Sequence, residues 1–238
     1  MKINLIVIAA ALAVEVALWF IYRLHLGRYN LIRNTETSRI TTLKKGFYEI
    51  KGKVKFLEEK LTSPYSRIPC VYYHFKVEEE RGDGKHSHWY SLIDDRKSVQ
   101  FAVEDPSGMA YINLDGAKLK LSTDAKGGTG LFTETSPKLE KTMALYHQTS
   151  KGWIFKRKLR FSEKYITEND ALYVLGEVQD FKSYYPVFSK GKLPFLVSDQ
   201  SEEKLLKTAK RIVQVVLFFL LAVPAGVILF LLFRSSWV

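Results

Sequence analysis

Cysteine is almost absent from this chain of 238 residues, in which Cys70 is the only one. A single thiol excludes an internal disulfide bond, and it also excludes a zinc site built from several cysteine ligands. Charge is absent from the apolar run at residues 212–233 and nearly absent from residues 3–22, where Glu15 is the only charged residue. The two ends of the chain are therefore unlike its middle, which holds most of the charge.

Both apolar runs are long enough to cross a membrane as helices. A hydrocarbon core about 30 Å thick needs roughly 20 helical residues, and neither run has the polar face of a soluble core helix. The sequence predicts transmembrane helices at residues 3–22 and 212–233, with one extramembrane domain at residues 35–205. The small residues 9–13 also resemble a signal-peptide cleavage site, but the apolar run continues through Trp19 and Phe20, which favours an uncleaved anchor.

The charges beside the two runs bear on orientation, because Lys and Arg near membrane spans tend to stay in the cytoplasm. The outer ends carry only Lys2 and Arg234. The domain side carries nine basic residues: Arg23, Arg28, Arg33, Arg39, Lys192, Lys204, Lys207, Lys210 and Arg211. This asymmetry predicts a two-pass protein with a cytoplasmic domain. The opposite orientation stays open, since long domains can translocate despite their charge.

The extramembrane domain is predicted to be mainly β (α+β), because several segments alternate between apolar and polar residues. The predicted strands are residues 47–56, 70–77, 153–161, 171–178 and 194–197, and a hairpin at 98–113 turns at Asp105-Pro-Ser-Gly108. One short helix is expected at 137–147 with Ser136 as its cap. Residues 81–85 and 124–130 are expected to be polar, glycine-rich loops. A closed or half-closed β-barrel of the five-stranded type accommodates this order of strands.

Three histidines are the nearest approach to a metal site in the domain. His86 and His88 lie on one side of an extended segment, and His74 lies on a neighbouring predicted strand; zinc or copper accepts three imidazoles. No neighbouring carboxylate or thiol completes the set, so solvated histidines are the simpler interpretation. Gly127-Gly-Thr-Gly130 lacks the Lys and Ser or Thr of a phosphate-binding loop. No cofactor is therefore expected, and a metal-dependent enzyme is kept only as an alternative.

Lys156, Lys158 and Arg160 alternate with apolar and other residues, so they share one face if the segment is a strand. The chain carries a net charge of +11, which attracts a basic domain to anionic lipid headgroups. The three residues are therefore candidates for headgroup binding. Nucleic acid is not expected as a partner, because no aromatic platform for stacking bases is evident.

Glu15 is a carboxylate in the middle of a predicted span, where charge costs about 3 kcal/mol on insertion scales. The other span offers no cation to pair with it. We interpret Glu15 as an intramembrane assembly contact with another membrane protein or with a second copy, and a proton site is the alternative.

Several sequence segments of the domain resemble the GIDE, or beside-a-membrane, family. They lie at residues 37–54, 61–73, 89, 101–110, 160–178 and 195–199, and they cover roughly residues 35 to 205. The resemblance implies a β-rich domain between two membrane spans. In eukaryotic relatives that domain faces a non-cytosolic compartment, which conflicts with the charge argument, and a C-terminal RING finger gives ubiquitin ligase activity.

A chain with one cysteine cannot form a RING, so this sequence resembles the short, RING-less prokaryotic forms of the family. The expected function is a non-enzymatic, membrane-tethered sensing or scaffolding module, concerned with envelope stress or the assembly of membrane complexes. The alternatives are an E3 ubiquitin ligase relative, which the family name suggests, and a metal-dependent enzyme built on the histidines.

Overall fold

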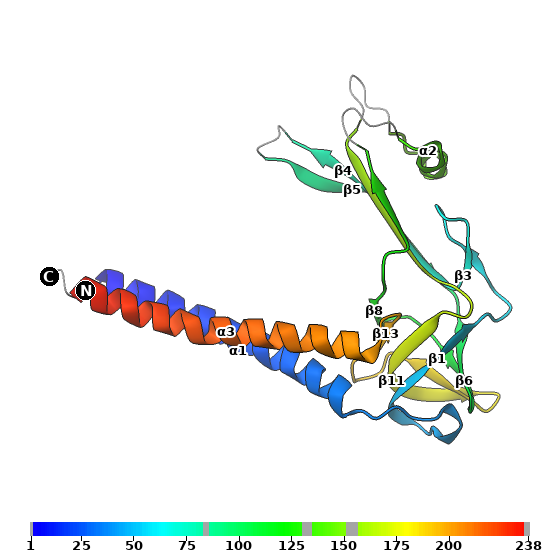
Figure 1. Ribbon diagram of the computed structural model, residues 1–238, viewed down its shortest axis with the longest axis horizontal. Helices are drawn as coiled ribbons and strands as arrows, with labels where there is room; N and C mark the ends of the chain where they lie inside the picture. The colour runs from blue at the N-terminus through cyan, green and yellow to red at the C-terminus, as the bar shows by residue number, and fades with distance from the viewer. Residues whose placement is uncertain (1, 83–85, 130–134, 151–156, 236–238) are drawn as a thin grey trace. The chain divides into compact units, whose positions relative to one another are not determined.

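A computed structural model describes residues 2–82, 86–129, 135–150 and 157–235 of the chain (Figure 1). The chain divides into two compact units. One unit comprises Met1–Glu36 together with Ser201–Val238, and the other is Thr37–Gln200.

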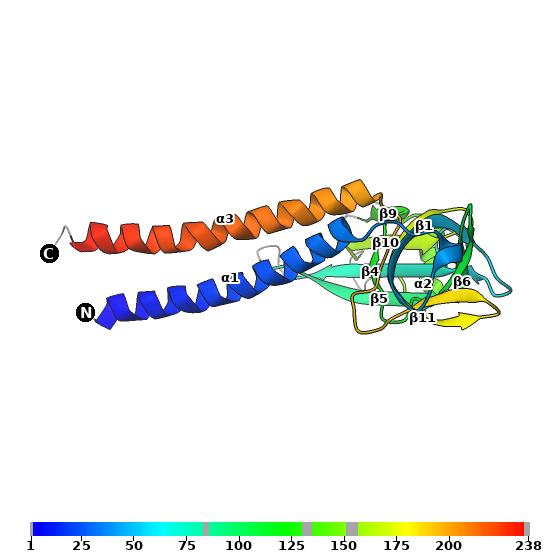
Figure 2. The ribbon, with the colours of Figure 1, turned by 90° about the horizontal axis from the view of Figure 1, so that it is seen from below.

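The first unit consists of two long helices, α1 (Lys2–Asn34) and α3 (Glu202–Ser235). Figures 1 and 2 both show α1 and α3 side by side, with the two chain ends at the same end of the pair. The stretches Val7–Asn34, of 28 residues, and Glu202–Phe233, of 32 residues, are long and apolar enough to cross a membrane. Both helices extend well beyond the predicted spans, and α3 continues through Pro224. This is the arrangement of a two-pass membrane protein.

The second unit is built around a closed ring of five strands. The strands are β1 (Gly46–Lys55), β6 (Phe101–Asp105), β7 (Gly108–Ile112), β12 (Tyr185–Ser189) and β11 (Ala171–Lys182). Each pairs with the next in that order, and β11 returns to pair with β1. The predicted five-stranded barrel is therefore confirmed. All pairs of the ring are antiparallel except β7 with β12, which run parallel.

Two short strands extend the ring. The strand β13 (Leu196–Ser198) pairs with residues 173–175 of β11, which also pair with β1, and β8 (Lys118–Lys120) pairs with β13. A single 3-10 turn, η1 (Ile40–Thr42), precedes β1. The inward-facing residues form one apolar core, which includes the fully buried Ile50, Val54, Phe101, Ile112, Val174 and Phe188. Burial of each such side chain stabilises the domain by about 1.5–3 kcal/mol.

A separate sheet of four strands has the order β5 (His88–Ser98), β4 (Tyr72–Arg81), β10 (Leu159–Ile166) and β9 (Ala125–Gly128). Burial alternates along β4 from Tyr73 onward, since Tyr73, Phe75 and Val77 are buried whereas His74 and Lys76 are not, but Cys70 and Tyr72 are buried as well. The helix α2 (Pro137–Ala144) contributes Leu139 and Met143 to a second core with this sheet. The ribbon β2 (Leu61–Thr62) with β3 (Pro69–Cys70) precedes β4.

The local signals for the hairpin and the short helix are confirmed. Asp105 pairs with Gly108 at the β6–β7 turn, and its carboxylate accepts hydrogen bonds from the backbone N–H groups of Ser107 and Gly108 at 2.6 and 2.8 Å. Ser136 caps α2, since its hydroxyl accepts a hydrogen bond from the N–H of Leu139 at 3.2 Å. These features depend on residues within four positions of each other, which is why the sequence reveals them.

The prediction of a loop at residues 124–130 was wrong, because residues 125–128 form β9. A Cβ at Gly127 would lie 2.6 Å from the ring of Phe161, and a Cβ at Gly128 would lie 2.9 Å from the carbonyl oxygen of Leu159. The glycines are therefore needed for a strand that passes close to its neighbour, as glycine in a strand often indicates. Of the strand predicted at 153–161, residues 151–156 lie outside the described part, and β10 begins at Leu159.

Candidate functional site

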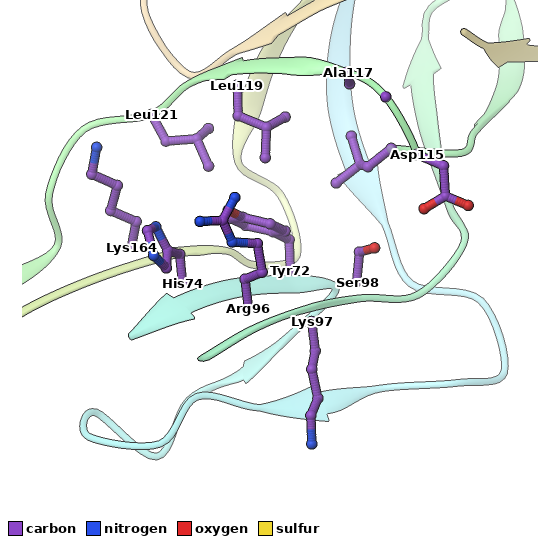
Figure 3. Close-up of a pocket in the computed structure, with 12 residues that line it drawn as sticks. Tyr72, His74, Arg96, Lys97, Ser98, Asp115, Ala117, Leu119, Leu121 and Lys164 are labelled. Atoms are coloured by element: carbon purple, nitrogen blue, oxygen red, sulfur yellow. The ribbon is translucent and has the colours of Figure 1, made fainter. Parts of the chain in front are cut away.

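A cavity of about 580 Å³ lies between the four-stranded sheet and the segment that contains β8 (Figure 3). One wall comes from β4, β5 and β10 through Tyr72, His74, Arg96 and Lys164. The opposite wall comes from residues 114–121, with the apolar Leu114, Ala117, Leu119 and Leu121 and, at one end, the carboxylate of Asp115 (Figure 3). The volume falls within the range of small-molecule sites.

Three basic side chains form a row across the sheet wall of this cavity. His74 on β4 pairs with Arg96 on β5 at one side and with Lys164 on β10 at the other. Residues paired across strands share a face of the sheet, so the three side chains stand next to one another. Figure 3 shows Lys164, His74 and Arg96 together below Leu119 and Leu121, while Lys97 points away. We call Lys164, His74 and Arg96 the basic row.

Asp94 is a carboxylate that contacts this row. Its Oδ1 lies 2.9 Å from Nε2 of His74 and 3.3 Å from Nη2 of Arg96. Burial alone would raise the pKa of Asp94, but the hydrogen bonds from His74 and Arg96 outweigh it and hold the pKa below its usual value. Lys164 forms no ion pair with any residue in the described ranges. The row therefore has more positive charge than its single carboxylate neutralises.

Lys164 and Arg96 lie on either side of His74 on one face of the sheet, so the basic row is suited to binding an anion. An arginine fork and a lysine can bind the oxygens of a carboxylate or phosphate by charge-assisted hydrogen bonds. Tyr72, whose pKa is raised by burial and by Asp94 against the opposing effect of Arg96, offers a neutral hydroxyl in the same wall. The arrangement can bind an anionic group, and the leucines opposite can contact an apolar part of the same molecule.

The three histidines of the predicted metal site are not brought together. His74 lies opposite Arg96, whereas His88 lies opposite Arg81 at the far end of the β4–β5 pair. Eight residues of extended chain separate Arg96 from His88, which is roughly 26 Å at the usual rise. His86 precedes β5 and is exposed. Across the residues that the structure describes, no group of three or more His, Cys, Asp or Glu side chains is placed to hold a metal ion.

The predicted headgroup-binding residues are only partly described, because Lys156 lies outside the described residues. Lys158 forms an ion pair with Glu80, and Arg160 forms one with Glu78 at 2.6 Å. The guanidinium of Arg160 also lies 4.2 Å from the centre of the Trp89 ring. Headgroup binding at Lys156, Lys158 and Arg160 stays a prediction, and an anionic lipid would have to compete with these glutamates for both described cations.

Glu15 lies on the less exposed side of α1, in a series that recurs every three or four residues at Val7, Ala11, Glu15, Leu18 and Tyr22. Such spacing is typical of helices that pack along a common seam. The Oε1 atom of Glu15 is buried and has no hydrogen-bond partner in the described part of the chain. The role of Glu15 in assembly stays a prediction, and the unpartnered oxygen is the observation that favours it.

Cys70 is fully buried beside the four-stranded sheet. Burial, and after it the charge of Glu163, raise the pKa of the Cys70 thiol to about 12. Since the thiolate is the reactive form, we expect Cys70 not to react with a maleimide at pH 7.5 while the protein is folded. Mass spectrometry should find one adduct only after denaturation. Rapid labelling of the native protein would contradict this assignment.

Sequence reasoning missed Arg96 and Lys164, and it named His74 for a different chemistry. The basic row exists only through the strand register, and no spacing along the chain indicates it. The signal that was available is the alternation of residues 70–77, which places His74 on the face away from the buried Phe75.

The family model described as "GIDE: E3 Ubiquitin ligase" matches residues 72–230 of the chain. This range includes all three residues of the basic row. No curated protein and no solved structure matches the chain.

Proposed function

The chain belongs to the GIDE family, and from this premise we propose that it is a membrane-tethered, non-enzymatic sensing or scaffolding module that recognises an anionic group in the cavity above the basic row. The observation that carries this proposal is the positive charge of Lys164 and Arg96, which lie on either side of His74 across three adjacent strands with Asp94 as the carboxylate in contact with the row. Binding of an anion explains why the sheet keeps these two cations on one face.

The opposite wall of the cavity narrows the class of ligand. Leu114, Leu119 and Leu121 face the basic row across a space of about 580 Å³. An amphipathic anion fits both walls, with its carboxylate or phosphate at the row and its apolar part along the leucines. A lipid headgroup and a soluble organic phosphate or carboxylate share this chemistry.

The two apolar helices give such a module its cellular context. A domain tethered to a bilayer meets membrane-borne ligands at a high effective concentration, so modest affinity is sufficient for occupancy. We propose that occupancy of the cavity reports on the membrane or on a membrane complex during assembly, as a sensor of envelope stress would. The basic residues flanking both spans favour a cytoplasmic position for the domain.

Charge reversal at Lys164 tests the proposal. The purified full chain is titrated by calorimetry with inorganic phosphate and with hexyl phosphate. Loss of a charge-assisted hydrogen bond costs about 1.5–3 kcal/mol, so Lys164→Glu should weaken hexyl phosphate binding by about 10- to 100-fold. Added salt should weaken the wild-type interaction too, because the row is partly open to solvent.

The matched control is Lys97→Glu, which makes the same change of charge on β5. Lys97 is exposed, and although it is one of the residues that line the cavity, its side chain points away from the basic row (Figure 3). Equal loss of binding in the two variants would mean that only net charge matters and would overturn the site. Tighter binding of hexyl phosphate than of phosphate indicates that the leucine wall takes part, and equal binding would limit the ligand to its anionic group.

A second candidate follows from the printed description of the family model, which is E3 ubiquitin ligase. The single cysteine of these 238 residues is buried Cys70, so the chain offers no cysteine ligand set for a zinc-binding RING. Ubiquitin chains formed by the purified protein with activating and conjugating enzymes, and not without it, would favour the ligase over the sensing module.

A further inference from the structure

The hairpin between β11 and β12 presents a tyrosine in an unusual way. Lys182 pairs with Tyr185, so Ser183 and Tyr184 alone form the turn, with φ of 50° and 73°. Two-residue hairpin turns with both residues at positive φ favour Asn and Gly, and larger side chains there store strain of order 1–3 kcal/mol. Tyr184 is nevertheless 98% exposed. Among the residues that the structure describes, the side chain of Tyr184 has no hydrogen bond, ion pair or ring contact that offsets the cost of placing a large aromatic residue at this position.

The base of the hairpin contacts β7 and Gln100 through Tyr185 and Lys182, the two residues on either side of the turn. The Tyr185 ring lies 5.4 Å from the Tyr111 ring on β7, and Nζ of Lys182 lies 5.8 Å from the centre of the same ring. Lys182 also donates a hydrogen bond to the side-chain oxygen of Gln100 at 3.5 Å. A rigid, exposed aromatic anchor loses little entropy on binding, which is typical of interface residues.

A cavity of about 680 Å³ lies at the base of the same hairpin. Leu57 and Tyr111 give it an apolar part, while Glu58, Glu59, Gln100 and Lys182 supply polar groups. This lining suits a phenol, whose ring needs an apolar contact and whose hydroxyl needs an acceptor. Because Tyr184 is almost fully exposed, it does not fill this cavity in its own chain.

We propose that the occupant of this cavity is Tyr184 of a second copy of the chain. Tyr184 follows Lys182, which lines the cavity, by two residues, and in the proposed dimer a two-fold axis relates the copies so that each Tyr184 enters the cavity of the other. Such an isologous contact is the commonest form of homodimer. Lys182 of one copy meets Glu58 and Glu59 of the other, which is a favourable pairing of charge.

Because the membrane helices hold the copies in one bilayer, a contact of this small size is sufficient for two copies to associate. A single inserted ring buries less surface than a stable soluble dimer needs. Two copies that share a bilayer have a common orientation and a high effective concentration, which offsets part of the cost of association. A bilayer surface is the rival occupant for an exposed tyrosine, but the adjacent Glu58 and Glu59 would repel anionic lipid.

Cross-linking between two tagged full-length copies in the same membranes tests the proposal. One copy carries Glu58→Cys and the other carries Tyr184→Cys, while Cys70 stays in place because its thiol is buried. The matched control replaces Tyr184→Cys by Asn169→Cys, since Asn169 is also exposed and also has positive φ, at 67°. We expect the 184–58 disulfide to form at least about tenfold faster than the 169–58 disulfide, as a local contact requires. Equal rates would indicate random collision and would overturn the proposal.

A second variant separates association from folding. Glycine adopts positive φ freely, so Tyr184→Gly should raise the unfolding midpoint while abolishing energy transfer between fluorescently tagged copies. A fall in both would show that Tyr184 supports the fold instead. A fluorophore can also be attached at Tyr184→Cys. If nitroxide-labelled lipids quenched it, the tip of the β11–β12 hairpin would contact the bilayer, and this result would also overturn the proposal.

Discussion

Replacing Glu163 with alanine should lower the free energy of unfolding of the extramembrane domain by about 2–6 kcal/mol, because two backbone N–H donors lose their acceptor. Glu163 on β10 is fully buried, and its two oxygens accept hydrogen bonds from the backbone N–H groups of Tyr65 and Ser66 at 2.6 and 2.8 Å. Alanine would leave both donors without acceptors next to a new cavity. Each unsatisfied buried donor costs about 1–3 kcal/mol.

The carboxylate of Glu163 also fixes a connection of the fold. Its two hydrogen bonds join the turn between β2 and β3 to a strand that lies almost a hundred residues later in the chain. The same turn contains Arg67 at φ of 62°, a conformation that needs support from its surroundings. Loss of Glu163 should therefore release this turn as well as destabilise the core.

Urea denaturation of the purified full chain in detergent, followed by fluorescence, measures the change. Glu163→Gln should lie between wild type and Glu163→Ala, because it keeps one acceptor oxygen. The control is Glu168→Ala, which removes an exposed carboxylate in the β10–β11 turn and should alter stability by less than about 0.5 kcal/mol. If Glu163→Ala and Glu168→Ala had the same urea midpoint, the two hydrogen bonds that Glu163 accepts would not contribute to stability.

Gly52→Ala should destabilise the barrel by more than about 3 kcal/mol, beyond the usual cost of overpacking a core. A Cβ at position 52 would lie 2.3 Å from the carbonyl oxygen of Glu104 and 2.8 Å from a methyl group of Val103. The closest atom is backbone, so relief would require β1 to move away from β6. The position is critical because β1 pairs with β11 up to Lys53 and with β6 from Lys53 onward.

Thermal unfolding and protease resistance of the two-span protein report this effect. Gly27→Ala in α1 is the matched control, because a Cβ there meets nothing within 4 Å and alanine favours helix over glycine by about 1 kcal/mol. We expect the control to be as stable as wild type or more so. A normal unfolding midpoint for Gly52→Ala would mean that β1 and β6 are not as close as the structure places them.

The sequence predicts those parts of the fold that depend on neighbours in the chain. The alternation of Val71, Phe75 and Val77 identifies a buried strand face, and Asp105 with Gly108 identifies a turn. Gly127 and Gly128 misled the sequence interpretation because glycine is typical of loops, and the close approach of Phe161 that requires glycine is a tertiary fact. A pattern along one strand does not reveal what the next strand brings to it.

The same limit applies to the candidate sites. The alternation of Lys158 and Arg160 is visible in the sequence, but their partners Glu80 and Glu78 are supplied by the register of β4 with β10. The same register creates the basic row four residues further along β10. There Lys164 lies opposite His74, whereas Arg160 lies opposite Glu78. Which cations are neutralised and which remain available is thus decided by strand pairing.

The closure of the ring by β1 and β11 also sets an order of events during synthesis. Glu49 of β1 and Tyr173 of β11, which are joined by a side-chain hydrogen bond of 2.6 Å, lie 124 residues apart in the chain. At about 5–20 residues per second, β1 leaves the ribosome roughly 6 to 25 s before the partner that closes the ring. Throughout this interval α1 is complete, and the edge of β1 that pairs with β11 is open. Contacts so distant in sequence also fold slowly, so the nascent domain, held by one helix, needs protection from wrong strand pairing until β11 emerges.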